Sequence, residues 1–242
     1  MQPNRQKELF YDGMAETFDT VRNRYEVEKR MRLVFDEFLG RDNLHGKWLL
    51  DAGCGTGEFT QLARARGAIA VALDIGMALV QKTRRRCDEA LGLVGDLGCL
   101  PLQEGWFDYV VCTEAIEHTR SPRDSVRELC RTIKPGGKLV LTVPNRLWHF
   151  ALRIAKALNT RPYDGYEYWL WQAQLQRWLL EERMEILEVV GFNIIPITVP
   201  ALNGLIAFCD RFGRPLRGMM VNLGVVARKR LSERIQGSPW LQ

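Results

Sequence analysis

The segment LLDAGCGTGEF, residues 49–59, places a glycine-rich turn between a short apolar run and an amphipathic helix. Gly53, Gly55 and Gly57 lack a Cβ, so the backbone there can adopt positive φ and approach a ligand closely. The helix that follows offers unpaired N–H groups at its N-terminus. This order of strand, turn and helix is typical of an α/β fold that binds its ligand at the carboxyl ends of the strands.

The rest of the chain repeats this pattern, because short apolar runs alternate with helical periodicity as in βαβ units. The chain has 242 residues, of which 46% are hydrophobic and 26% charged, and this composition suits one α/β domain over residues 1–242. We expect strands at 48–50, 69–73, 93–94, 107–112 and 138–143, and helices at 25–39, 58–66, 77–89 and 121–133. Further on we expect a helix at 180–190 that ends at Gly191, then strands at 192–199 and 220–227.

Two stretches interrupt the alternation. Residues 146–177 are rich in aromatic side chains and are interpreted as a cap inserted after the fifth strand; these are Trp148, Phe150, Tyr163, Tyr166, Tyr168, Trp169 and Trp171. Residues 201–218 form a second, irregular apolar segment. Both are expected near the same edge of the sheet.

Three acids follow three successive strands of the expected sheet. Asp51 precedes the glycine turn, where it would disfavour a pyrophosphate but suit an ammonium or sulfonium group. Asp74 ends the second strand, where a carboxylate can accept both hydroxyls of a ribose. Asp96 follows the third strand and is placed to accept a hydrogen bond from an adenine amino group. Together with the GxGxG spacing, these acids argue against a dinucleotide cofactor. Helix capping is the alternative role for each acid.

These motifs resemble those of the class I S-adenosylmethionine-dependent methyltransferases from about Tyr11 to Arg228, through LLDAGCGTG, ALDIG, VGDLGCLPLQEGWFDYVVC and LVLTVPN. The resemblance implies a Rossmann-like, seven-stranded, mostly parallel sheet with helices on both faces and the last strand antiparallel. It also implies S-adenosylmethionine as the cofactor. The cofactor contacts expected from the motifs and from the resemblance are Tyr11, Arg32, Asp51, Gly53, Gly55, Gly57, Asp74, Ile75, Asp96, Leu97 and Thr113.

The block Glu114-Ala115-Ile116-Glu117-His118 follows the fourth strand and offers the candidate catalytic groups. Methyl transfer from a sulfonium needs mainly alignment, and a general base only if the acceptor carries a proton. His118 is the candidate base, and a histidine that only closes the turn is the alternative. The block resembles the E-x-x-E-H of the ubiquinone-biosynthesis O-methyltransferases and of the small-RNA 2′-O-methyltransferases. That resemblance implies Mg²⁺ on Glu114, Glu117 and His118. His149, at the end of the neighbouring fifth strand, is a candidate for a fourth ligand.

The cap guides the expectation for the acceptor. Aromatic side chains beside Arg146, Arg153, Lys156 and Arg161 suit a lid over an apolar acceptor, or a peripheral contact with a membrane. We expect O-methylation of a small apolar, phenolic or prenylated molecule. The alternatives are a metal-free N- or C-methyltransferase of a natural product or lipid, an RNA 2′-O-methyltransferase, and a non-catalytic cofactor-binding module, which the intact loop disfavours.

Charge and cysteine content narrow the partners and the compartment. The formal charge is +5, but the cations cluster only at 84–86 and 228–230, which disfavours a nucleic-acid partner. The six cysteines show neither a CxxC pair nor zinc spacing and are expected to be reduced thiols. No apolar run approaches the roughly 20 residues that span a bilayer, and the N-terminus lacks a signal-peptide core. We expect a cytoplasmic protein, at most peripheral to a membrane, whose oligomeric state the sequence does not predict.

Overall fold

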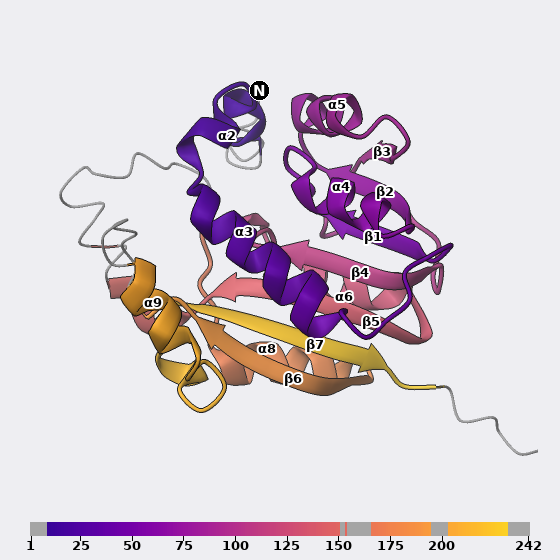
Figure 1. The fold of residues 1–242 in the computed structure, drawn as a ribbon. Helices are drawn as coiled ribbons and strands as arrows, with labels where there is room; N and C mark the ends of the chain where they lie inside the picture. The colour runs from indigo at the N-terminus through magenta and orange to yellow at the C-terminus, as the bar shows by residue number, and fades with distance from the viewer. Residues whose placement is uncertain (1–8, 151–152, 154–165, 195–202, 232–242) are drawn as a thin grey trace, which may run out of the picture.

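A seven-stranded sheet organises the computed structural model, which describes residues 9–150, 153, 166–194 and 203–231 (Figure 1). The strand order is β3-β2-β1-β4-β5-β7-β6, and only β7 runs antiparallel to its neighbours. The strands are β1 (Trp48–Ala52), β2 (Ile69–Asp74), β3 (Leu91–Val94), β4 (Phe107–Thr113), β5 (Ile133–Pro144), β6 (Met184–Phe192) and β7 (Asn222–Lys229). The predicted Rossmann-like sheet with its antiparallel last strand is confirmed.

Helices cover both faces of the sheet, as expected. On one face lie α3 (Arg24–Arg32), its π-helical continuation η2 (Leu33–Phe38) and α4 (Glu58–Ala65); on the other lie α6 (Pro122–Thr132) and α8 (Gln172–Glu181). Adjacent residues of β1 serve the two layers, because Leu49 packs with α3 and α4 whereas Leu50 packs with α6 and α8. α5 (Met77–Arg86) packs against β2 and β3 at one edge.

Local sequence signals explain where the helices begin. The Asn23 side chain accepts hydrogen bonds from the backbone N–H groups of Tyr25 and Glu26 at the start of α3. Ser121 does the same for Asp124 at the start of α6, with Pro122 in the first turn. These caps fix the direction in which each helix leaves the sheet, and therefore the positions of the loops above the strand ends.

The helix predicted at 180–190 is wrong. α8 ends at Glu181, Arg183 turns with φ +58°, and residues 184–192 form β6 instead. Eight residues of β6 pair with β7, so tertiary pairing outweighs the helical spacing of the apolar residues. Gly191 therefore lies in a strand and does not cap a helix. Glycine is needed there because a Cβ would lie 2.6 Å from the Cα of Arg217. Phe192 ends β6, and 195–199 of the predicted next strand lie outside the described residues.

The two irregular stretches are only partly described. From the expected cap, residues 151–152 and 154–165, with Tyr163, lie outside the described residues. The described part contains the short helix η4 (Arg146–Trp148), a bridge between Asn145 and Leu170, and the start of α8. The segment 201–218 is not irregular throughout, because it contains α9 (Asn203–Asp210) and leads into η6 (Arg217–Met219).

Candidate active site

A cavity of about 750 Å³ opens at the carboxyl ends of the parallel strands. This volume lies within the ~300–1,000 Å³ typical of small-molecule sites. Its walls come from the glycine loop after β1, the ends of β2 and β4, the face of α3 and the N-terminal segment. Eight carboxyl groups and three arginines line it, so the cavity favours a cationic ligand: Asp12, Glu26, Glu58, Asp74, Asp96, Glu114, Glu117 and Glu167, against Arg22, Arg30 and Arg120.

The glycine loop forms the cradle that the sequence predicts. Gly53, Gly55 and Gly57 all have positive φ, and the N–H of Gly53 donates to the carbonyl of Leu73 at 2.8 Å. A Cβ on Gly53 would lie 2.5 Å from that of Ala115, so only glycine lets the loop pack on the block after β4. Gly53 and Gly55 line the cavity, whereas Gly57 packs against Thr83 of α5.

The two buried acids beside the loop have different roles. Asp74 lines the cavity, and its carboxylate accepts from the N–H groups of Gly55 and Gly76, both at 3.0 Å. Asp51 lies behind the loop, where it accepts from the hydroxyl of Thr60 at 2.5 Å and does not line the cavity. Burial raises the pKa of each carboxyl group to about 6, although these hydrogen bonds oppose the shift.

The remaining predicted cofactor contacts divide in the same way. Ile75, Asp96, Leu97 and Thr113 line the cavity, and Asp96 also accepts from the N–H of Gly98 at 2.7 Å. Arg32 is exposed on α3 and does not line it. A different arginine of the same helix, described below, faces the cavity.

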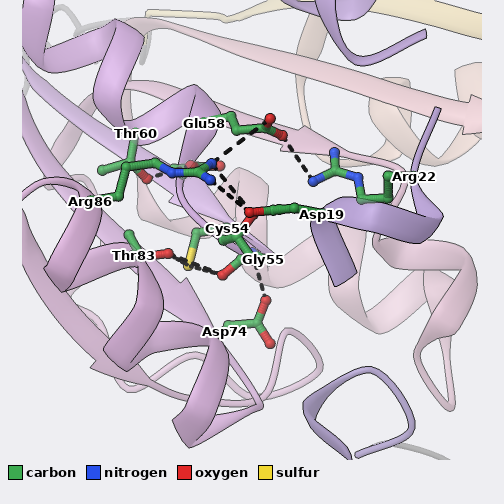
Figure 2. A network of polar contacts seen from close by, with 11 residues as sticks. Asp19, Arg22, Cys54, Gly55, Glu58, Thr60, Asp74, Thr83 and Arg86 are labelled. Carbon is green, nitrogen blue, oxygen red and sulfur yellow. Dashed lines mark hydrogen bonds and ion pairs between the residues drawn. The ribbon is translucent and has the colours of Figure 1, made fainter. Parts of the chain in front are cut away.

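The N-terminal segment, residues 9–23, crosses the cavity and is tied to the core by polar contacts. Asp12 accepts from the N–H of Ala78 at 2.7 Å, at the start of α5. On α2 (Phe18–Val21), Asp19 accepts from the Thr56 hydroxyl at 2.5 Å and pairs with Arg86 at 2.7 Å. Figure 2 shows Asp19 and Arg22 reaching toward the loop, where Arg22 pairs with Glu58 at 3.0 Å. The segment therefore closes one side of the cavity at the end formed by the glycine loop.

His118 lies between the N-terminal segment and the described end of the expected cap. Its Nδ1 is 2.8 Å from the carbonyl oxygen of Tyr166, and its Nε2 is 3.3 Å from the hydroxyl of Tyr11. Because a carbonyl only accepts, Nδ1 carries the hydrogen of the neutral ring. Nε2 then presents a lone pair, which the Tyr11 hydroxyl satisfies. His118 and Tyr11 both line the cavity.

Two glutamates lie near His118, of which Glu114 is half-buried and Glu117 is buried. Glu114 has φ +49°, and its Oε2 accepts from the Asn222 amide at 3.1 Å and lies 3.8 Å from an Nη of Arg30. Glu117 is 2% exposed, with Oε1 3.9 Å from the His118 Nε2. Burial and the charge of Glu114 raise the pKa of Glu117 well above its usual value.

The predicted Mg²⁺ does not fit this arrangement. Across residues 9–150, 153, 166–194 and 203–231, no group of three or more His, Cys, Asp or Glu side chains is arranged to hold a metal ion. The guanidinium of Arg30 supplies the positive charge beside Glu114 instead. His149, the predicted further ligand, contacts Trp169 edge-on and does not line the cavity.

Comparisons with known proteins show the family to which the chain belongs. A family model described as a methyltransferase domain matches residues 50–141. A ubiquinone biosynthesis O-methyltransferase of Xanthomonas oryzae pv. oryzae is 32% identical over 174 residues, which are 66% of this chain and 72% of that relative. The chain belongs to the S-adenosylmethionine-dependent methyltransferases.

Solved structures show the same fold as this methyltransferase. The magnesium protoporphyrin IX methyltransferase of Synechocystis PCC 6803 with bound S-adenosylhomocysteine gives a TM-score of 0.67 at 15% identity, covering 93% of this chain and 98% of that one. A methyltransferase of Haloferax volcanii, in complex with a methyltransferase activator, gives a TM-score of 0.69 at 19% identity, covering 91% of this chain and 97% of that one. At these identities the likeness concerns the fold alone.

Several residues that line the cavity of this methyltransferase were missed by the sequence analysis. Glu26 and Arg30 share one face of α3 with its cap Asn23, at the spacing i, i+3, i+7, whereas Arg32 lies about 200° around the helix from Arg30. Helical periodicity could have found this face. Asn193 and Asn222, at the ends of β6 and β7, had no such signal, because their place depends on strand pairing.

Proposed function

We propose that this methyltransferase transfers the methyl group to an oxygen of a small phenolic or other hydroxyl-bearing acceptor, with His118 as the general base. The observation that carries the proposal is the position of the Tyr11 hydroxyl, 3.3 Å from the Nε2 of His118. A phenol oxygen therefore already lies within hydrogen-bond reach of a basic nitrogen inside the cavity. An acceptor hydroxyl would take the place of Tyr11 there.

The residues that would hold the cofactor are those of the glycine cradle and the adjoining strand ends. Gly53 and Gly55 leave room for the ligand against the backbone, and the Asp74 carboxylate is available to the ribose hydroxyls. Asp96 stands at the next strand end. When bound, S-adenosylmethionine supplies a methyl group activated by a positively charged sulfur. The acidic lining of the cavity favours that charge.

The chain's own groups then handle the acceptor proton. As the acceptor oxygen takes the methyl group, its hydrogen passes to Nε2 of His118, and the Tyr166 carbonyl keeps the imidazole oriented through Nδ1. The Glu117 carboxyl group, whose Oε1 lies 3.9 Å from Nε2, is close enough to interact with the imidazolium that forms. The N-terminal segment limits the access of water to the reacting atoms.

The proposal is tested with a set of apolar phenols, matched amines and a structured RNA, measuring S-adenosylhomocysteine formed by pure protein. We expect turnover with phenols. Turnover with amines or RNA alone would contradict O-methylation of a small molecule.

The role of His118 is tested on the phenol that reacts best. His118→Ala is expected to lower kcat about 10²–10⁴-fold, the usual contribution of a general base. Cofactor affinity, measured by calorimetry, should stay within about twofold, because no contact to the glycine loop is lost. Unchanged kcat in His118→Ala would remove His118 from the mechanism. Tyr11→Phe serves as the matched variant, since loss of the competing hydroxyl should lower KM for the phenol without a comparable loss of kcat.

A further inference from the structure

An exposed apolar surface is formed by α9, the segment from its end through η6, and residues 147–150 in and after η4. We name it the α9 surface; its members are Leu205, Phe208, Phe212, Leu216, Met219, Leu147 and Phe150, each between 40% and 58% exposed. Phe208 meets Phe212 edge-on at 5.7 Å, and Trp148, stacked on Phe150, donates to the carbonyl of Met219 at 2.8 Å. The turn joins these two parts, because the N–H of Leu216 donates to the carbonyl of Phe212 and the N–H of Met219 donates to the carbonyl of Leu216. Figure 1 shows α9 at the side of the molecule near the start of β7.

The helix itself is amphipathic across this surface. Ile206 points into the protein and is 3% exposed, whereas Leu205 and Phe208 on the other side are 57% and 54% exposed. An apolar helical face that the described residues leave exposed marks an interaction site. Its large aliphatic and aromatic side chains are those that enter the boundary between head groups and acyl chains.

Cations outnumber acids along the segment that carries the α9 surface. Between residues 203 and 219 the chain has Arg211, Arg214 and Arg217 and a single acid, Asp210, which pairs with Lys29. Arg214 pairs with Glu188, so Arg211 and Arg217 supply the positive charge of this segment. Arg146, at the start of η4, is a further exposed cation. A basic fringe around an apolar face is complementary to a surface that is anionic at its head groups and apolar beneath them.

The α9 surface also adjoins the part of the cavity nearest His118. Val221 and Asn222 line the cavity, two and three residues beyond Met219. Trp169, another lining residue, contacts His149 in the same run as Leu147 and Phe150. We propose that the α9 surface docks this methyltransferase on an anionic lipid bilayer, with the acceptor end of the cavity toward the membrane. In the part of the chain that the structure describes, no helix is long and apolar enough to cross a bilayer.

The docking is tested by sedimentation of the full chain with phosphatidylcholine vesicles that contain or lack phosphatidylglycerol. Binding is expected with the anionic vesicles, to weaken as salt rises, and to be far weaker with phosphatidylcholine alone. The assay needs no acceptor, so its result is independent of the proposed O-methylation. Equal binding to both vesicles, or none to either, would overturn the proposal.

Paired variants locate the contact. Arg211→Gln/Arg217→Gln is expected to lower the partition coefficient about 25-fold, since each cation near an anionic surface contributes about fivefold. Phe208→Ser/Phe212→Ser should lower binding by at least as much. Leu91→Ser, which is equally exposed on β3 at the other edge of the sheet, and Arg127→Gln on α6 are the matched controls and should bind like the wild type.

Two further measurements keep the test decisive. Cofactor binding by each variant shows that it is folded. Light scattering compares the mass of the wild type with that of Phe208→Ser/Phe212→Ser. A wild-type dimer that this variant dissociates would assign the α9 surface to a second copy of the chain and overturn the membrane proposal, as would variants that bind anionic vesicles like the controls.

Discussion

At the residue scale, Asp74 links the chemistry of the cavity to pH. Its carboxyl group is buried, and burial raises its pKa to about 6 although two backbone N–H groups favour the charged form. In the free protein Asp74 therefore keeps its proton at pH values between the ordinary pKa of an aspartate and about 6, where an exposed aspartate would be ionised. In the proposed site the ribose hydroxyls would donate to this carboxylate, so cofactor binding should favour the ionised form and release that proton.

Cofactor affinity should therefore depend on pH. As the pH falls below about 6, the Kd for S-adenosylmethionine is expected to rise by up to tenfold per unit, because binding must first deprotonate Asp74. Above that pH the affinity should level off. Calorimetry in two buffers of different ionisation enthalpy measures the released proton directly. The variant Asp74→Asn should bind more weakly and lose this pH dependence; an unchanged slope in it would show that another group titrates.

The folded state itself responds to the same shift. Asp51 and Asp74 both have raised pKa values of about 6. Between about pH 4 and pH 6 the folded protein therefore binds more protons than the unfolded chain. Their contribution to the free energy of unfolding is present at low pH and is lost as the pH rises through that window. The bound cofactor would offset the loss at Asp74 only, since Asp51 does not line the cavity.

At the element scale, the N-terminal segment is the part of the site held mainly by polar side chains. Burial alone would raise the pKa of Asp19, but the Thr56 hydroxyl and the Arg86 guanidinium lower it, so this carboxylate is charged at neutral pH. The pairs Asp19–Arg86 and Arg22–Glu58 link α2 to α5 and α4, as Figure 2 shows. Partly exposed pairs of this kind stabilise only modestly, by about 0.2–1 kcal/mol each.

Loosening this element should weaken cofactor binding without unfolding the sheet. For Asp19→Asn we expect faster hydrogen exchange over residues 9–23 and a two- to fivefold higher Kd for S-adenosylmethionine, as ~1 kcal/mol of closure is lost. Arg24→Gln is the matched control, because it breaks the exposed pair with Glu28, which does not join the segment to the core. Equal exchange and affinity in both variants would contradict the closing role of the segment.

The elements also show what sequence patterns could and could not predict. The strands β1, β2 and β4 and the helices α4 and α6 follow from apolar runs, glycines and caps that act locally. The prediction for residues 184–192 was wrong because their apolar residues fit a helix as well as a strand. Only pairing with β7, about forty residues later, decides between the two. The same dependence on distant pairing hid Asn222, which holds Glu114.

At the scale of the whole molecule, the site divides into a predictable half and an unpredictable one. The glycine cradle and the acids Asp74 and Asp96 lie at successive strand ends, so the topology of a parallel sheet brings them together. The end near His118 is built from α3, β6, β7 and the segment around Tyr166, which no local pattern brings together. Only the three-dimensional structure shows that Arg30 lies beside Glu114. The poor fit of a metal ion at this position follows from that contact.

The central claim is that one S-adenosylmethionine molecule binds across these strand ends, cradled by Gly53 and Gly55 and held through Asp74. Titration calorimetry of the pure protein with S-adenosylmethionine and S-adenosylhomocysteine tests it most directly. The account predicts saturable binding of one ligand per chain, lost or greatly weakened in Asp74→Ala and retained in Asp88→Ala, whose carboxyl group is exposed outside the cavity. Absence of binding by the wild type, or equal affinity in the two variants, would contradict it.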